Sequence, residues 1–144
     1  MWARDGRRSN LYGHVDLTPK GKFEVRSYQT FTLTYTVGRF GLDDTGAIRV
    51  IFRAMGDTGT LQTDDPTADN FVSARASNDA TLSVDYARRG KSARPRWKSL
   101  TVNVTGGYMR EGDTITLVFG DTSYGSNGLK LQTMVETDFE FKFL

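Results

Sequence analysis

The stretch that decides the fold reads Glu111-Gly112-Asp113-Thr114-Ile115-Thr116-Leu117-Val118-Phe119-Gly120-Asp121. Within it, Ile, Leu and Phe alternate with Thr, Thr and Val from residue 114 to residue 119. Side chains of a β-strand point to opposite faces with a period of two, so this alternation predicts a strand with one apolar face. Gly and Asp on both sides favour turns. The stretch therefore predicts one half-buried strand of an antiparallel sheet.

The same alternation recurs along most of the chain, and clusters of Gly, Asp, Ser and Asn separate the runs. Strands are predicted at residues 12–17, 23–27, 29–37, 47–54, 71–76, 81–86, 98–105, 115–119, 129–136 and 139–143. No segment shows the periodicity of an amphipathic helix. Short strands at this spacing are typical of two packed sheets. The prediction is an all-β fold, an antiparallel β-sandwich that is jelly-roll-like, with about nine to ten strands.

Length and composition narrow the classes of function. A chain of 144 residues fits one domain that buries about two-thirds of the surface of its unfolded form. It contains no Cys, which excludes a disulfide framework, a thiol nucleophile and a Cys-based zinc site. The net charge of +2 is nearly balanced, so we do not expect nucleic acid as a partner. No run approaches the ~18 apolar residues of a membrane helix, so we expect no membrane partner.

Two parts of the chain differ in character. Residues 1–10 are polar and rich in Arg and read as an N-terminal arm, whereas residues 11–144 form the predicted sandwich domain. The arm lacks the apolar segment of a signal peptide, and the compartment stays open. The sequence ends at Phe141-Lys142-Phe143-Leu144, inside a strand-like alternation. Because natural termini usually trail into polar residues, we expect a domain excised from a longer protein.

Several segments together carry a resemblance to a known family. They are Tyr35-Thr36-Val37-Gly38, Gly41-Leu42-Asp43-Asp44-Thr45-Gly46, Gln62-Thr63-Asp64-Asp65-Pro66, Asp69-Asn70-Phe71-Val72, Arg94-Pro95, Gly112 to Asp121, Gly125-Ser126-Asn127-Gly128 and Gln132-Thr133. The chain resembles the N-terminal β-sandwich domain of a family of large bacterial proteins. These proteins also carry a domain similar to the polymerase-and-histidinol-phosphatase (PHP) group of metal-dependent hydrolases. The resemblance implies a non-catalytic accessory domain, since the His-rich metal motif of the hydrolase domain has no counterpart here.

Residues suited to catalysis are scarce. His14 is the only imidazole, so a triad built on a histidine base could use that residue alone. A surface histidine at the edge of a strand is the alternative interpretation. We expect no catalytic residue and no cofactor in this domain, and a small enzyme that uses loop carboxylates is the third hypothesis.

Paired aspartates in the predicted loops are candidate calcium ligands. Asp43, Asp44, Asp64 and Asp65 place several oxygens in two turn-rich segments, and hard cations prefer such ligands. Their spacing does not follow the D-x-D-x-D-G pattern of a helix–loop–helix site. Asp is also common in turns for local reasons, so no bound metal is the main expectation.

A basic loop and several exposed aromatic residues are candidate ligand-binding groups. Arg94, Arg96 and Trp97 lie in one basic segment, and Tyr124 lies in the loop that follows residue 119. Loop aromatics serve as platforms for sugars, but they also fill interfaces between domains. A solvated basic loop is the alternative for the arginines.

Two hypotheses lead from these observations. The first is a non-catalytic accessory or interaction domain of a larger, hydrolase-like bacterial protein. It would dock through loop 38–46 or loop 55–70 onto another domain of that protein, or form a homodimer. The second is a carbohydrate-binding-like module, with or without calcium.

Overall fold

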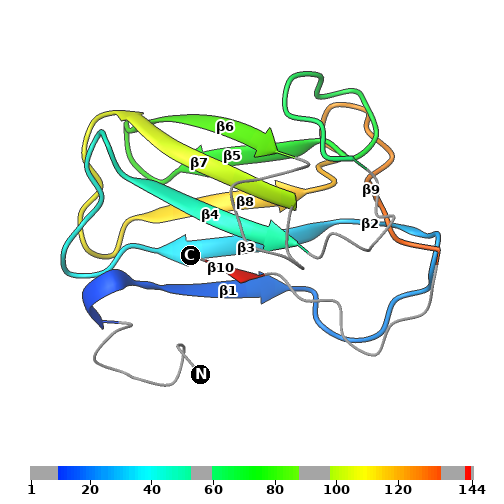
Figure 1. Cartoon of the computed structure of the whole chain (residues 1–144), viewed down its shortest axis with the longest axis horizontal. Coiled ribbons are helices and arrows are strands. Elements are labelled where there is room, and N and C mark those ends of the chain that lie inside the picture. Colours follow the sequence, from blue (N-terminus) through cyan, green and yellow to red (C-terminus); the bar gives the residue numbers. More distant parts are fainter. Residues whose placement is uncertain (1–9, 53–59, 88–97, 134–141, 144) are drawn as a thin grey trace.

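The computed structural model describes residues 10–52, 60–87, 98–133 and 142–143 of the chain (Figure 1). Within these ranges it contains ten strands. They are β1 (His14–Thr18), β2 (Tyr28–Gln29), β3 (Phe31–Thr36), β4 (Ala47–Phe52), β5 (Val72–Ala76), β6 (Thr81–Ala87), β7 (Lys98–Gly106), β8 (Thr114–Phe119), β9 (Leu129–Lys130) and β10 (Lys142–Phe143). Residues 10–12 are helical. The predicted all-β class and strand number are confirmed.

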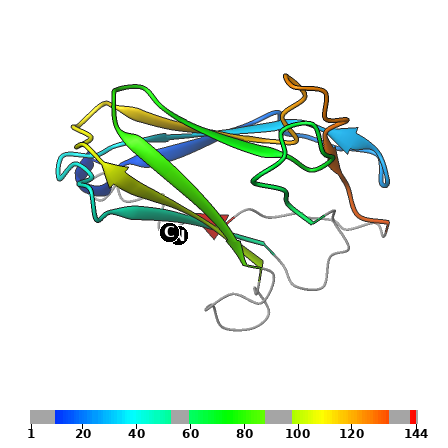
Figure 2. The same ribbon diagram turned by 90° about the horizontal axis from the view of Figure 1, so that it is seen from above.

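Two four-stranded antiparallel sheets face each other. The first sheet has the order β1-β3-β8-β5 and the second has the order β10-β4-β7-β6, while β2 and β9 form a separate pair. Seen from above, the sheets lie as two layers (Figure 2). The chain passes from one sheet to the other between β3 and β4, β4 and β5, β5 and β6, and β7 and β8. This alternation is the connectivity of a jelly-roll-like sandwich, as predicted.

The core lies between the sheets and follows the predicted alternation. On the first sheet Leu33 pairs with Leu117, and on the second Val50 pairs with Leu100. These four side chains are at most 2% exposed. Their outward neighbours on β3 and β8 are mainly threonines of intermediate exposure. The apolar face of each strand therefore packs against the opposite sheet, which is the main source of stability in such a fold.

The predicted strand at residues 23–27 is wrong. Arg26 has a φ of 63°, which is incompatible with a strand. Ser27 donates a backbone hydrogen bond to the Glu24 carbonyl over 3.4 Å, so the segment closes a turn. The apolar residues at 23 and 25 suggested a strand, but they are half-buried beside a bend. Pairing begins only at Tyr28, where β2 meets β9.

Three predicted strands have different bounds. The strand expected at 29–37 is interrupted at Thr30, so that Gln29 belongs to β2 and Phe31–Thr36 form β3. The strand expected at 12–17 starts at His14, because residues 10–12 are helical and Gly13 has a φ of 97°. The strand expected at 129–136 keeps its ladder only over Leu129–Lys130. Residues 131–133 leave the strand conformation while Leu131 still donates to the Ser27 carbonyl over 2.9 Å. The rest of that run, residues 134–136, and the greater part of the 139–143 run lie outside the described residues.

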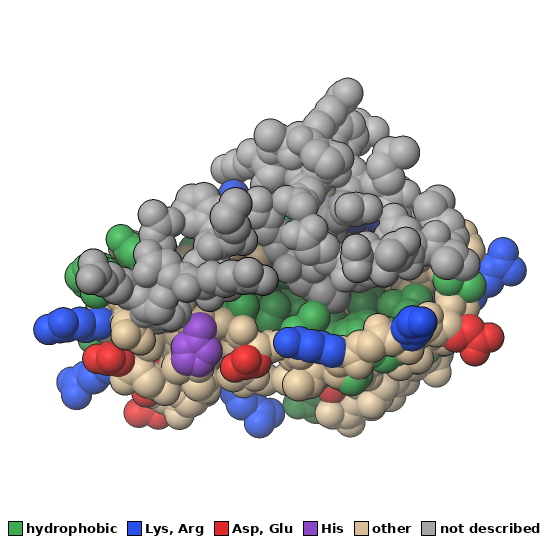
Figure 3. Space-filling view, turned by 90° about the horizontal axis from the view of Figure 1, so that it is seen from below, with side chains coloured by type: hydrophobic (Ala, Val, Ile, Leu, Met, Phe, Trp, Pro, Cys, Tyr) green, Lys and Arg blue, Asp and Glu red, His purple; other side chains and the backbone are tan. Residues whose placement is uncertain are grey.

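The side of the molecule that carries β1 mixes charges of both signs. Acidic and basic side chains are interspersed over the described part of this face (Figure 3). His14 is exposed on the outer face of the first sheet, where it pairs across the ladder with Thr36. In the described ranges, no helix has the length and apolar character needed to cross a membrane.

Candidate functional site

One end of the sandwich is built from four short segments that are far apart in sequence. They are the helical residues 10–12 and the loops 38–46, 77–80 and 107–113, which lie together at the left of Figure 1. Backbone hydrogen bonds join them. Arg39 donates to the Asn10 carbonyl over 2.8 Å, and Leu42 and Met109 exchange two bonds of 2.8 Å each. We call this surface the loop end.

An aromatic pair lies on one side of the loop end. The rings of Tyr12 and Phe40 are 5.5 Å apart at an angle of 56°. They are 64% and 61% exposed, respectively. The backbone under them is fixed, because Phe40 donates to the Leu11 carbonyl over 3.2 Å and the buried Tyr35 hydroxyl donates to the Tyr12 carbonyl over 2.6 Å. Burial raises the pKa of Tyr35, so this hydroxyl stays protonated and keeps donating.

A third exposed ring of the loop end, Tyr108, lies in the loop before β8. Its ring is half exposed and lies directly against Gly41, the residue after Phe40. A Cβ at Gly41 would collide with the Tyr108 hydroxyl, and the φ of 70° at this position also favours glycine. Glycine at position 41 therefore lets the Tyr108 ring approach loop 38–46 closely.

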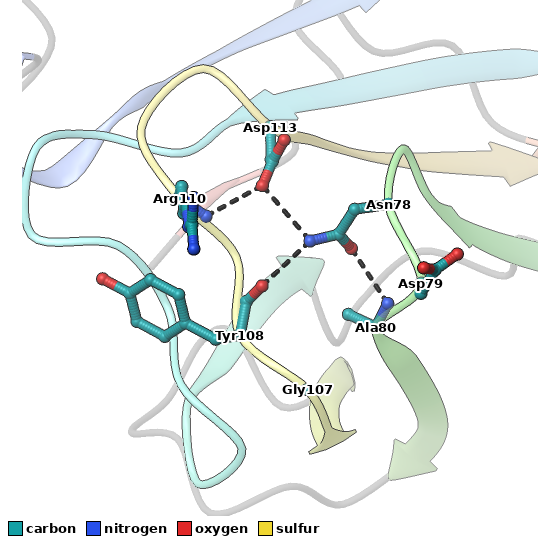
Figure 4. A pocket seen from close by; sticks show the side chains of 7 residues that line it. All are labelled: Asn78, Asp79, Ala80, Gly107, Tyr108, Arg110 and Asp113. Atoms are coloured by element: carbon teal, nitrogen blue, oxygen red, sulfur yellow. Dashed lines mark hydrogen bonds between the residues drawn. The ribbon is translucent and has the colours of Figure 1, made fainter.

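A cavity of about 380 Å³ opens beside Tyr108 (Figure 4). Asn78, Asp79, Ala80, Gly107, Tyr108, Arg110 and Asp113 line it. Its volume is near the lower end of the ~300–1,000 Å³ typical of small-molecule sites. The cavity lies between the β5–β6 turn and the β7–β8 turn, so residues more than 25 positions apart form its two walls.

Asn78 holds these two walls together. Its Nδ2 donates to the Tyr108 carbonyl over 2.9 Å and to Asp113 Oδ2 over 3.2 Å. Its Oδ1 accepts from the Ala80 backbone over 2.9 Å. Asp113 Oδ2 also accepts from the Arg110 backbone over 2.8 Å. The Asn78 amide is thus used inside the protein, and it fixes the shape of the cavity rather than facing a ligand.

The groups left to meet a ligand are of mixed character. Within the described ranges, the Arg110 guanidinium and the Tyr108 hydroxyl have no protein partner, and Asp79 is exposed. Together they offer donors, acceptors and an aromatic face on a rigid frame. Such a set suits a neutral ligand with many hydroxyl groups and an apolar face.

The sequence-based ligand candidates do not meet at this cavity. Tyr124 is 58% exposed and lies at the opposite end of the sandwich, where its ring packs edge-on against Phe71 at 6.4 Å. Arg94, Arg96 and Trp97 lie outside the described residues.

The candidate calcium ligands Asp43 and Asp65 accept hydrogen bonds from residues of their own turns. Asp43 Oδ1 accepts from the Thr45 hydroxyl over 2.8 Å and from the Thr45 backbone over 3.1 Å. Asp65 Oδ1 binds Thr67 in the same way, over 2.7 and 3.0 Å. These hydrogen bonds, with the side-chain bond the strongest, hold the pKa of both carboxyls below its ordinary value. Asp44 and Asp64 are exposed. Within the described ranges, no three His, Asp or Glu side chains gather to hold a metal ion.

Sequence reasoning missed most of the cavity. It assigned Tyr12 to a strand, and it gave no role to Asn78 or Arg110. The one available signal was the Asn78-Asp79 turn between two strands, which marks a loop but not its neighbours.

Comparisons with known proteins are sparse. No protein-family model matches the chain, and no curated protein matches it. A solved structure of the CBM3a-L domain with flanking linkers, from scaffoldin cipA of the Clostridium thermocellum cellulosome, shares 12% identity at a TM-score of 0.43 and covers 92% of this chain and 80% of its own. A second structure, the family 3a carbohydrate-binding module of the cipA scaffolding of the same organism, shares 9% identity at a TM-score of 0.40 and covers 90% of each chain. Similarity of this degree does not bear on what the chain binds.

Proposed function

We propose that this domain is a non-catalytic carbohydrate-binding module whose binding site is the loop end. The observation that carries the proposal is the set of three exposed rings, Tyr12, Phe40 and Tyr108, on hydrogen-bonded loops beside a polar cavity. A sugar presents C–H groups on its faces and hydroxyls on its rim. Aromatic rings bind the former, and charged or amide groups bind the latter.

Rigidity at the loop end supports this proposal. The three rings stand on backbone that is already fixed by the Asn10, Leu11, Leu42 and Met109 hydrogen bonds. Because these loops are already ordered, little conformational entropy is lost when a ligand binds. This raises the affinity for a ligand that makes only a few polar contacts.

The mixed charge of the cavity narrows the ligand class. Arg110 is the one basic side chain in its lining, and Asp79 and Asp113 are the acidic ones. A strongly anionic glycan would meet both carboxylates, so a neutral glycan fits the lining better.

The test is a titration of the ¹⁵N-labelled domain with neutral trisaccharides, namely cellotriose, xylotriose, mannotriose and chitotriose. We expect one of them to shift the backbone amides of Gly41, Asn78 and Tyr108. Tyr108→Ala should weaken binding by about tenfold, corresponding to the 0.5–1.5 kcal/mol of a stacked ring plus its buried area.

Tyr108→Phe is the matched control, because it keeps the ring and should keep most of the affinity. Unchanged amides at the loop end with all four sugars would contradict the proposal. Binding that is lost in a calcium chelator would show instead that the ligand is held through a metal.

The second candidate is an accessory domain that docks onto a neighbouring domain of a larger, hydrolase-like bacterial protein, or onto a second copy. The observation that favours it is Phe40, an apolar side chain 61% exposed at the tip of loop 38–46. Analytical ultracentrifugation of the wild type and of Phe40→Ser tests the homodimer. A dimer that Phe40→Ser dissociates would support docking through this loop, and a monomer at all concentrations would oppose it.

A further inference from the structure

The opposite end of the sandwich carries a second pair of fixed, exposed aromatic rings. Here β2, β9, the segment 69–71 and the loop 120–128 lie together, at the right of Figure 1. The rings belong to Tyr28 and Tyr124, which are 42% and 58% exposed. We call this surface the far end.

Tyr28 is held by a polar contact. Its hydroxyl donates to Asp69 Oδ2 over 3.2 Å. The other carboxylate oxygen, Asp69 Oδ1, accepts from Asn127 Nδ2 over 2.8 Å and from the Asn127 backbone over 3.3 Å. Asp69 therefore fixes the orientation of the Tyr28 ring, and the loop 120–128 in turn holds Asp69 in place.

Tyr124 is held by packing and by a buried carboxylate near it. Its ring meets the buried Phe71 ring edge-on at 6.4 Å. Asp121, which is 8% exposed, accepts from Ser73 Oγ over 2.6 Å and from the Ser123 backbone over 2.9 Å. These bonds tie the start of the loop to β5, and the loop presents Tyr124 outward.

The two rings are anchored to neighbouring points of one segment. Tyr28 binds Asp69, and Tyr124 packs on Phe71, two residues further along the chain. The residue between these two anchor points is Asn70, whose φ of 64° turns the chain. The exposed Asn127 side chain and the Asp69 carboxylate, which accepts from Tyr28 and Asn127, add polar groups to this surface. The far end thus repeats the combination of rings and polar groups found at the loop end.

We infer that the far end is a second glycan-binding site, so that one long neutral glycan chain occupies both ends of the domain. The inference rests on the proposed function of the loop end. The two sites are separated by the lengths of β3 and β8, six residues each, or about 20 Å. A trisaccharide is too short to bridge them, whereas a polysaccharide binds both and gains from the effective concentration of the second site.

The experiment compares short and long ligands on the full chain. In the NMR titration with the trisaccharide that binds, we expect a second set of shifted amides at Asp69, Phe71 and Asn127, beside the set at the loop end. This readout needs no variant and therefore does not depend on how a variant folds.

Affinity electrophoresis in gels that contain the matching soluble polysaccharide gives the second measurement. Tyr108→Ala and the double variant Tyr28→Ala with Tyr124→Ala should each weaken polysaccharide binding at least tenfold. In the trisaccharide titration, each of them should remove only the shifts of its own end.

The outcomes separate the inference from the proposed function. If loop-end shifts appear and the double variant binds polysaccharide as the wild type does, the second site is refuted and the proposed function stands. If only the far-end amides shift, the loop end does not bind glycan. The proposed function of the loop end is then refuted, and so is the inference that one glycan chain occupies both ends. Far-end shifts with the trisaccharide and no loss of polysaccharide binding in the double variant would also refute bridging.

Discussion

The Ser73→Ala substitution tests the strongest side-chain contact beneath the far end. Ser73 Oγ donates to Asp121 Oδ2 over 2.6 Å, and the carboxylate is almost fully buried. Hydrogen bonds to charged groups contribute about 1.5–3 kcal/mol each. Because the Ser123 backbone still donates to the other oxygen, we expect a loss at the lower end, about 1.5–2 kcal/mol of unfolding free energy. For 144 residues this corresponds to a Tm lower by about 5–8 °C.

The loss should depend on pH with a defined sign. Burial alone would raise the pKa of Asp121, but hydrogen bonds from Ser73 and Ser123, with Arg75 nearby, hold the pKa below its ordinary value of 3.8. A carboxyl whose folded pKa is depressed stabilises the protein above its unfolded pKa and loses that contribution as the pH falls through the folded pKa. The difference between wild type and Ser73→Ala should be full at pH 7 and shrink below about pH 4.

Urea unfolding followed by fluorescence, at pH 7 and at several values down to pH 3, measures both effects. Ser83→Ala is the matched control, since Ser83 also lies on a strand at intermediate exposure but makes no side-chain hydrogen bond within the described ranges. We expect that control to change stability by less than about 0.5 kcal/mol. A Ser73→Ala loss equal to the control, or one that is constant from pH 7 to pH 3, would refute the assignment of a charged hydrogen bond.

Three further predictions concern the core and the two ends. Leu117→Ala should lower the free energy of unfolding by about 2–5 kcal/mol because the side chain is fully buried. Thr116→Ala, on the outer face of the same strand, should lower it by less than about 1 kcal/mol. Urea unfolding of both variants measures the difference. Asp69→Asn should lower the pKa of Tyr28 toward 10, because the Asp69 charge is the main cause of its raised value. Tyrosinate absorbance measured against pH tests this. An unchanged pKa would mean that the Tyr28–Asp69 hydrogen bond is not formed in solution. Gly41→Ala should lower Tm more than Gly112→Ala, since both have positive φ but only a side chain at 41 would displace the Tyr108 ring; equal losses would count against that contact.

The strands that could be predicted from the sequence are the ones that form the core. The runs with Leu33, Leu100 and Leu117 place an apolar residue at every second position, and each forms a strand because a period of two gives one buried face. The prediction failed at Arg26, where a positive φ closes a turn that the apolar residues at 23 and 25 concealed.

The candidate sites could not be predicted in the same way, because their contacts join residues that are distant in sequence. Asn78 binds Tyr108 and Asp113 from 30 and 35 positions away, and Asp69 binds Tyr28 and Asn127 from 41 and 58 positions away. Local patterns placed the Asn and Asp residues of these pairs in turns or loops, but they did not indicate a partner for any of them. Which turns meet is set by the order in which the strands cross between the sheets.

The crossing order also explains why the two ends resemble each other. Each crossing between the sheets needs a connection over an end of the sandwich, so each end gathers several loops that must hydrogen-bond to one another. Polar side chains such as Asn78 and Asp69 make the hydrogen bonds that join these loops. The rings beside them stay exposed because the core between the sheets is already filled. In this sandwich the loops at both ends are therefore hydrogen-bonded to one another, and both carry exposed aromatic rings. The distance between the two ends is fixed by the length of the paired strands that connect them, so it cannot change without a matching change in both sheets.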